Sequence, residues 1–380
     1  MAKKIKIIRA TTKSVSLNAF CKGLLRELSK KYEVLALSSP DDSLENFAKD
    51  EGVRAIAVPM ERHISIVKDF KSLWKMIRVF QKEKPTMVHS MTPKAGLLCM
   101  MAAWLVRVPV RVHTFTGLVF PTSTGLKKKV LMATDWLTCA CATHIIPEGE
   151  GVKNDLIQNG ITKKPLKVLG YGNVRGVDMS YYDRTPEVED VALTIRDKSK
   201  FTFLFVGRVV KDKGINELLE AFKMLYRTNP NIRLLLVGPY EDNLDPITEE
   251  ARDTIEKYND IVSVGLKTGV ELLAYYAASD CFVLPSYREG FPNTVLEAGA
   301  MGLPSIVTDV NGSREIIKEG INGMIVPSYE VEPLYRAMLT IIQSSADRNR
   351  MASNARKMIE ERYEQGFVRN CLYDFYDKVL

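Results

Sequence analysis

The first half of the chain alternates short runs of β-branched and apolar residues with longer amphipathic stretches. The short runs predict strands at residues 5–9, 32–37, 54–58, 87–89 and 110–114. The amphipathic stretches predict helices at residues 17–29, 65–83 and 95–105. Such alternation is typical of a parallel sheet with helices on both faces.

The same pattern restarts at Phe201, after an aperiodic segment at 169–186 that is rich in glycine and polar residues. Further strands are predicted at 201–206, 233–237, 261–264, 281–284, 305–307 and 323–326, with a helix at 215–228. A long helix is predicted from about residue 347 to the last residue, with a break near Gln365 and Gly366. We therefore expect an α/β protein with two Rossmann-like lobes and an interdomain cleft, joined by the segment 169–186.

Size and composition agree with this prediction. A chain of 380 residues exceeds the usual size of one core. The six cysteines lack C-x-x-C spacing, and we expect reduced, buried thiols. The most apolar stretch, 95–110, is interrupted by Arg107 and Pro109 and falls short of a membrane span. The basic start of the chain is too briefly apolar for a signal peptide, so we expect a soluble or peripheral protein.

The net charge of +7 is unevenly distributed along the chain. Residues 1–170 hold 28 Lys and Arg against 14 Asp and Glu, whereas the remainder holds 25 against 32. A basic first half indicates an anionic partner, for which nucleic acid, an anionic membrane and a phosphorylated substrate all qualify.

The first candidate site follows the strand 201–206, where Gly207-Arg208 and then Lys213-Gly214 lie just before a helix. A guanidinium, an ammonium and a helix N-terminus together suit a phosphate. The alternative is that both cations are simply solvated on a βα loop.

The second candidate site is the segment 289–297, which follows the strand 281–284 and begins a helix near Asn293 or Thr294. Gly290 allows close approach of a ligand to the backbone, and the helix start offers N–H groups to an anion. Glu289 suits hydrogen bonds from sugar hydroxyls, and Glu297 suits a ribose diol. Thr294 and Glu297 also have the spacing of a capping box, so Glu297 could cap the helix instead.

A weaker signal is the strand that ends at Gly265-Leu266, where the backbone near Leu266 could hold a flat base. No pair of acidic residues forms a convincing metal-binding D-x-D motif, since Asp41-Asp42 has the character of a solvated turn.

These motifs together resemble the retaining glycosyltransferases of the GT-B fold, which carry two glutamates separated by seven residues. The resemblance covers nearly all of the second lobe, about 201–359, and is looser in the first. It implies that Arg208 and Lys213 bind the donor diphosphate, that Glu289 contacts the donor sugar and that Glu297 holds the ribose. It also implies that backbone N–H groups of Phe291, Thr294 and Val295 meet the sugar and diphosphate. No metal or other cofactor is then required, because these groups stabilise the leaving diphosphate.

The first lobe departs from the family pattern. Its first strand is followed by a loop without glycine, where Ser14 could approach the donor. Thr116 stands where relatives often carry a histidine, and His113 lies three residues earlier. His113 is either a catalytic group or a strand residue that is partly buried.

The segment 170–178 resembles the linker of bacterial enzymes that extend lipid-diphosphate-linked sugars. This implies transfer of a hexose or N-acetylhexosamine from a UDP-sugar to a lipid-linked saccharide, in surface polysaccharide or glycan assembly. Lobe 1–170, completed by about 365–380, would bind the acceptor, and lobe 171–364 the donor. A basic helix with aromatics at 65–83 and the lysines at 127–129 suit an anionic bilayer, so we expect a cytoplasmic protein at the inner face of the membrane. The alternative is an ordinary helix with solvated lysines.

Two other functions remain open at this point. A sugar-nucleotide epimerase of the same architecture would act on the donor without an acceptor. A protein that binds nucleotide-sugars or nucleic acid without catalysis is the second alternative, although no nucleic-acid motif is present and we expect no nucleic-acid partner. A nicotinamide-dependent enzyme is disfavoured, because no strand is followed by G-x-G-x-x-G.

Overall fold

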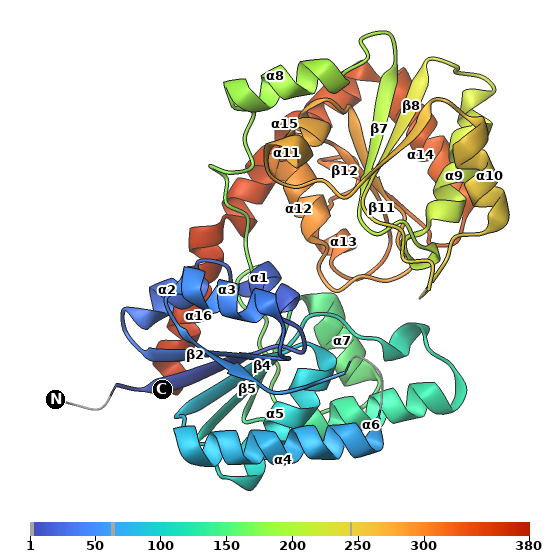
Figure 1. Ribbon diagram of the computed structural model, residues 1–380. Helices are drawn as coiled ribbons and strands as arrows, with labels where there is room; N and C mark the ends of the chain where they lie inside the picture. The colour runs from blue at the N-terminus through green and yellow to red at the C-terminus, as the bar shows by residue number, and fades with distance from the viewer. Residues whose placement is uncertain (1–3, 62–64, 244) are drawn as a thin grey trace. The chain divides into compact units, whose positions relative to one another are not determined.

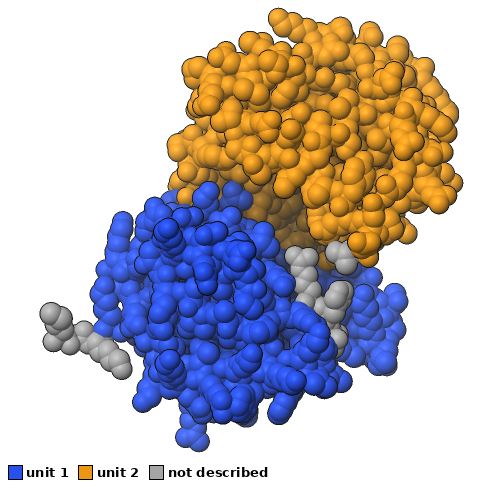
Figure 2. Space-filling model, viewed as in Figure 1, with its two compact units in different colours: residues 1–175, 366–380 blue, residues 176–365 orange. Residues whose placement is uncertain are grey.

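The computed structural model describes residues 4–61, 65–243 and 245–380. The chain divides into two compact units, which Figure 2 colours separately. Unit 1 consists of Met1–Arg175 and Gly366–Leu380, and unit 2 consists of Gly176–Gln365. Among the described residues, no helix combines the length and the apolarity needed to cross a bilayer.

Unit 1 is built on a six-stranded parallel sheet in the order β3-β2-β1-β4-β5-β6 (Figure 1). Its strands are β1 (Lys6–Ala10), β2 (Glu33–Ser38), β3 (Arg54–Ala57), β4 (Met87–Met91), β5 (Val110–Phe115) and β6 (His144–Pro147). Its helices are α1 (Ser14–Cys21), α2 (Leu24–Ser29), α3 (Asp42–Glu51), α4 (Ile66–Glu83), α5 (Pro93–Leu105), α6 (Gly125–Cys141), α7 (Glu150–Gln158) and α16 (Gln365–Val379), with a short 3-10 helix at Phe120–Thr122.

The two faces of this sheet bury separate apolar cores, because neighbouring strand residues point to opposite faces. Ile8 and Val88 pack with α4, α5, α6 and α7 on one face. Ile7 and Met87 pack with α1, α2, α3 and α16 on the other. The last helix of the chain therefore completes the core of unit 1.

Unit 2 repeats the design with a parallel sheet in the order β12-β11-β10-β7-β8-β9. Its strands are β7 (Phe201–Val206), β8 (Ile232–Val237), β9 (Ile261–Gly265), β10 (Cys281–Leu284), β11 (Ser305–Thr308) and β12 (Gly323–Val326). Its helices are α8 (Pro186–Ile195), α9 (Ile215–Tyr226), α10 (Glu249–Lys257), α11 (Gly269–Ala277), α12 (Asn293–Ala300), α13 (Ser313–Ile316), α14 (Val331–Gln343) and α15 (Ser345–Tyr363), with the 3-10 turn Lys211–Lys213 after β7.

The structure confirms the two Rossmann-like lobes, and two of its differences from the predicted elements have a clear local cause. The helix predicted at 17–29 is two helices, because Gly23 adopts a left-handed conformation (φ 77°) between them. Strand β6 was missed, since only Ile145 and Ile146 of its four residues are apolar and β-branched, and the proline at its end weakens the strand signal. The long C-terminal helix breaks where expected, with α15 ending at Tyr363 and α16 beginning at Gln365.

Both sheets have the doubly wound strand order, which reverses direction between β1 and β4 in unit 1 and between β7 and β10 in unit 2. At such a switch point the two following loops separate to opposite faces of the sheet and leave a crevice where ligands bind. In unit 2 those two loops are the ones that carry Lys213 and Glu289.

Candidate functional site

The loops after β7 and β10 bring the two candidate motifs of unit 2 together. Nζ of Lys213 lies 2.5 Å from Oε1 of Glu289, although 76 residues separate them in the chain. The lysine and glutamate side chains retain only 18% and 11% of their exposure. The result is a largely buried ion pair at the switch point of the sheet.

Close backbone contacts hold these loops against each other. Gly214 ends the turn after β7 with φ 71°, and a Cβ placed there would lie 2.0 Å from the carbonyl oxygen of Pro285. Only glycine therefore fits this position. The N–H of Tyr287 donates to the carbonyl oxygen of Asp212 at 2.9 Å, which adds a direct bond between the two loops.

Tyr287 is a contributor that the sequence did not single out. Its hydroxyl lies 2.7 Å from both carboxylate oxygens of Glu217 on α9, and its ring stacks on Tyr329 at 4.0 Å. Burial and the adjacent Glu217 carboxylate raise the pKa of the Tyr287 phenol. Tyr287 thus acts as a neutral brace that fixes the loop leading to Glu289.

Arg208 lies in the same loop as Lys213 but is paired differently. Its Nη1 donates to Oε2 of Glu241 at 2.6 Å, and both side chains are partly exposed. Glu241 belongs to the loop after β8. An anion that binds Arg208 through its guanidinium must therefore compete with a carboxylate of the protein itself.

Helix α12 begins at Asn293, as the sequence predicts, and its N-cap is Pro292. Among the described residues, no hydrogen bond uses the N–H of Thr294, which leaves it available to an anion. The N–H of Val295, however, already donates to the carbonyl oxygen of Pro292 at 3.2 Å. The expectation that Val295 offers its N–H to a ligand is therefore not met in this conformation.

The capping alternative for Glu297 is wrong. A capping box needs Thr294 at the N-cap, whereas this residue is the second of the helix, and among the described residues no side-chain hydrogen bond caps α12. Glu297 is instead buried, with Oε2 accepting a hydrogen bond from the Tyr276 hydroxyl at 3.1 Å. This bond holds a carboxylate on α12 against α11 without using it to start the helix.

The backbone at Gly290 and Phe291 is tightly enclosed on one side. The Phe291 ring is buried and lies 5.5 Å from that of Tyr363, so its side chain serves the core. Gly312, with φ 70°, packs so closely that a Cβ would lie 2.4 Å from the carbonyl oxygen of Gly290. The loop after β11 therefore supports the segment that precedes α12.

Leu266 follows β9 and is 70% exposed, so its side chain lies open on the surface of unit 2. The preceding residue, Gly265, accepts a hydrogen bond from the N–H of Gly238. The residues that the three motifs nominated thus lie in the loops after β7, β9 and β10 and in the first turns of α12.

The candidates in unit 1 fare differently. His113 on β5 is buried, with Nδ1 2.9 Å from the Ser90 hydroxyl and its ring so close to Gly96 of α5 that a Cβ there would overlap it. Burial lowers the pKa of His113 to about 3. The structure therefore favours the alternative of a strand residue, and more fully buried than expected.

Ser14 and Thr116 also differ from each other. Ser14 is buried at the start of α1, and its hydroxyl lies 2.5 Å from that of Ser43. Thr116 follows β5 and is partly exposed.

Asp41 is the N-cap of α3, and its side chain accepts a hydrogen bond from the N–H of Leu44 at 2.9 Å. The acidic pair at 41–42 therefore serves a helix start. Within the described residues, no group of three or more His, Cys, Asp or Glu side chains could hold a metal ion.

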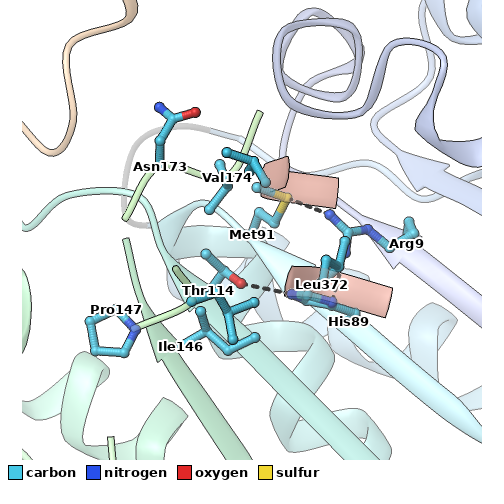
Figure 3. A pocket seen from close by; sticks show the side chains of 11 residues that line it. Arg9, His89, Met91, Thr114, Ile146, Pro147, Asn173, Val174 and Leu372 are labelled. Carbon is cyan, nitrogen blue, oxygen red and sulfur yellow. Dashed lines mark hydrogen bonds between the residues drawn. The ribbon is translucent and has the colours of Figure 1, made fainter. Parts of the chain in front are cut away.

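Unit 1 contains a second polar centre that the sequence analysis did not identify. Arg9 on β1 and His89 on β4 line a small cavity with Met91, Thr114 and residues of α16 (Figure 3). A signal was present, since Arg9 directly follows the apolar residues Ile7 and Ile8 in β1, but the pattern alone does not tell a buried arginine from an exposed one.

Comparisons with known proteins identify the family of the chain. The model of the family "Glycosyl transferases group 1" matches residues 189–358, and that of the "Glycosyl transferase 4-like domain" matches residues 17–172. The chain is 32% identical to the capsular polysaccharide biosynthesis glycosyltransferase CapM of Staphylococcus aureus, with 100% of this chain and 98% of that protein covered. It is 31% identical to the UDP-Gal:alpha-D-GlcNAc-diphosphoundecaprenol alpha-1,3-galactosyltransferase of Escherichia coli, with 82% and 80% covered.

Solved structures support the fold. HepE from Anabaena, in complex with UDP, superposes with a TM-score of 0.82 at 16% identity, covering 99% of this chain and 100% of that one. WaaG, a glycosyltransferase involved in lipopolysaccharide biosynthesis, superposes with a TM-score of 0.73 at 14% identity, covering 96% and 98%. Sequence, fold and matched relatives agree: the chain is a glycosyltransferase of the GT-B fold and belongs to the group 1 family.

Proposed function

We propose that the protein transfers a hexose or N-acetylhexosamine from a UDP-sugar to a lipid-diphosphate-linked saccharide, with retention at the anomeric carbon. The observation that carries the proposal is the Lys213–Glu289 pair, which lies at the switch point of unit 2 and close in sequence to the start of α12. A cation, a carboxylate and the available N–H of Thr294 suit a sugar attached to a diphosphate.

In the proposed reaction, the acceptor hydroxyl oxygen bonds to the anomeric carbon as the bond from that carbon to the diphosphate oxygen breaks. The hydroxyl proton passes to the departing diphosphate, so the products are the glycoside and UDP. Lys213, Arg208 and the N–H of Thr294 stabilise the charge that develops on the diphosphate. Fixed groups of this kind need little reorganisation during reaction, which makes them effective catalysts. A resident metal is not needed for this step.

The carboxylates take complementary parts. Glu289 accepts hydrogen bonds from donor-sugar hydroxyls while it holds the Lys213 ammonium in place. Glu297, fixed by Tyr276, accepts from the ribose diol. Gly290, Phe291, Asn293 and Val295 shape the backbone around the sugar and diphosphate. Leu266 lies beside the base.

Two curated relatives support the choice of donor and acceptor. The Escherichia coli relative is named for a UDP-Gal donor, a GlcNAc-diphosphoundecaprenol acceptor and an alpha-1,3 linkage. A Campylobacter jejuni relative, 22% identical over 94% of this chain, is named as an N,N'-diacetylbacillosaminyl-diphospho-undecaprenol alpha-1,3-N-acetylgalactosaminyltransferase. Both names describe alpha transfer to a diphosphate-linked lipid.

The first experiment is a thermal-shift screen of UDP-, GDP- and dTDP-sugars, since a ligand that binds only the folded state raises its Tm. The best donor is then incubated with a short-chain polyprenyl-diphosphate-linked GlcNAc, and the anomeric configuration of the product is determined by NMR. We expect a UDP-sugar to bind and an alpha-linked product to form. Conversion of the donor without acceptor would support an epimerase instead, and binding without either reaction would support a non-catalytic role.

The acceptor is expected at a membrane surface, and α4 of unit 1 supports this part of the proposal. Ser72, Met76 and Phe80 form its buried side. Phe70 and Trp74, one turn apart, are exposed instead.

The exposed side of α4 is also basic. Lys71, Lys75 and Arg78 accompany the two aromatic rings, and the Arg78 guanidinium stacks 3.4 Å from the centroid of Trp74. Exposed aromatic side chains among cations suit the interface of an anionic bilayer, with the cytoplasmic leaflet as the expected location.

Vesicle sedimentation tests this surface. Vesicles containing phosphatidylglycerol at low salt should bind the protein, and reversal of Lys71 and Lys75 to glutamate should weaken binding by about tenfold or more, because each basic residue near the surface contributes about 1 kcal/mol. The matched control reverses Lys257 and Lys357, two exposed lysines of unit 2. Equal effects of the two double variants would contradict a role for α4.

A further inference from the structure

Unit 1 encloses the guanidinium of Arg9, to which the described residues offer no acidic partner. Arg9 lies near the carboxyl end of β1, beside the switch point with β4, and is almost completely buried. Throughout the described ranges, no carboxylate lies within ion-pair distance of its guanidinium. Arginine keeps its charge in proteins, so this cation cannot relieve its burial by losing a proton.

The groups around Arg9 supply too few acceptors for its five N–H donors. Nη1 lies 2.6 Å from Nδ1 of His89 and 2.7 Å from the Tyr376 hydroxyl. Nη2 reaches only two sulfur atoms, those of Met91 at 3.0 Å and Cys21 at 3.4 Å, and sulfur is a weak acceptor. Nε has no partner.

His89 cannot offset this shortage. Because Arg9 can only donate, Nδ1 of His89 must accept, and it also lies 2.7 Å from the Tyr376 hydroxyl, so two donors converge on one lone pair. The proton of the neutral ring is then on Nε2, which lies 2.7 Å from the Thr114 hydroxyl. Burial and the adjacent Arg9 lower the pKa of His89, which keeps the ring neutral. The cluster as a whole therefore has a surplus of donors and a net positive charge.

A cavity adjoins this cluster, with a volume of about 20 Å³. Arg9 and His89 form one side of it, and Thr114 and Ile146 form another (Figure 3). Val368 and Leu372 of α16 also line it with apolar side chains. About 10–15 Å³ of such space holds one water molecule, so the cavity suits one small occupant and is too small for a phosphate.

From the donor surplus, the uncompensated charge and the size of the cavity, we propose that unit 1 binds a halide ion, such as chloride, beside Arg9. The ion receives the N–H groups that the protein leaves without strong acceptors and neutralises the guanidinium. Because Tyr376 and Leu372 belong to α16, the ion also strengthens the attachment of this helix to the sheet. The site is separate from the donor site of unit 2 and does not depend on the proposed transfer reaction.

Thermal unfolding at constant ionic strength tests the proposal, with sodium chloride replaced stepwise by sodium gluconate, whose anion is too large for the cavity. The wild-type Tm should rise with the logarithm of the chloride concentration once this exceeds the Kd, by roughly 3–6 °C at ten times the Kd. Arg9→Met should abolish the chloride dependence. Arg54→Met removes an exposed positive charge of the same unit and should retain it.

A second measurement keeps the proposal testable if Arg9→Met does not fold. Crystals of the wild-type protein grown in bromide should show an anomalous scattering peak within about 3.5 Å of the Arg9 guanidinium, the range of a charge-assisted contact to a large anion. A wild-type Tm that is identical in chloride and gluconate, together with no bromide peak at Arg9, would overturn the proposal. Stabilisation by sulfate or phosphate but not by halides would also overturn it, since those anions require a larger site.

Discussion

Replacement of Lys213 by alanine is the sharpest test of the donor site. The side chain is 18% exposed and its ammonium lies 2.5 Å from Glu289, so the charge is held in a mostly dry position. Removal of one preorganised group that stabilises developing charge costs about 10²–10³ in kcat, or about 3–4 kcal/mol. We therefore expect Lys213→Ala to lose at least about 100-fold in sugar transfer.

The same change also leaves Glu289 without its partner. An unsatisfied group at a largely buried position costs about 1–3 kcal/mol of stability, so part of any loss could reflect the fold. The double variant Lys213→Ala/Glu289→Gln separates the two effects. Because it removes the unpaired charge, it should recover most of the stability in urea unfolding while activity stays at least about 100-fold down.

Lys211 provides a matched control, because it lies in the same 3-10 turn but is exposed. Lys211→Ala should transfer sugar within about twofold of wild type, since an isolated surface charge contributes little. The assay measures UDP release from the donor selected by the thermal-shift screen, with the short-chain lipid-linked acceptor. If Lys213→Ala keeps more than a tenth of the wild-type kcat/KM, the assignment of this site is refuted.

Three further predictions concern affinity, packing and pH. Glu241→Gln should tighten UDP binding by up to about fivefold in calorimetry, because it removes the carboxylate that competes with the ligand for Arg208. The gain is limited because an exposed ion pair is worth at most about 1 kcal/mol. Weaker binding of UDP would contradict this prediction. Gly214→Ala should destabilise the protein by about 2 kcal/mol more than Gly320→Ala, because both positions have φ near 70° but only the first would collide with Pro285; equal losses in urea would show that the contact is unimportant. Burial raises the pKa of Asp135 to about 7, so the folded state holds this proton more tightly than the unfolded state. The free energy of unfolding should therefore fall as pH rises from about 4 to 7. Asp135→Asn should lack this fall and should be more stable than wild type by on the order of 1–3 kcal/mol at pH 8. If urea unfolding gives the same difference between the two proteins at pH 5 and at pH 8, the prediction is refuted.

The sequence by itself determined where most of the strands and several of the helices form, and where the donor motifs lie along the chain. The strand at 201–206, the helix start at Asn293 and the break before Gly366 are local properties, because side-chain periodicity, turn residues and helix breakers act over a few positions. The two-lobed fold followed from the order of these segments. Local signals failed where they were short or ambiguous, as at β6 and at Gly23.

Only the tertiary structure decided which residues meet. Strand order 3-2-1-4-5-6 makes β7 and β10 neighbours, and this contact joins Lys213 to Glu289 across 76 residues. The same kind of contact buries His113 under α5 and leaves Arg9 facing a cavity closed by the last helix. A strand residue points to one of two faces, but what covers that face is set by distant segments, so burial, pairing and charge balance cannot be deduced from local pattern.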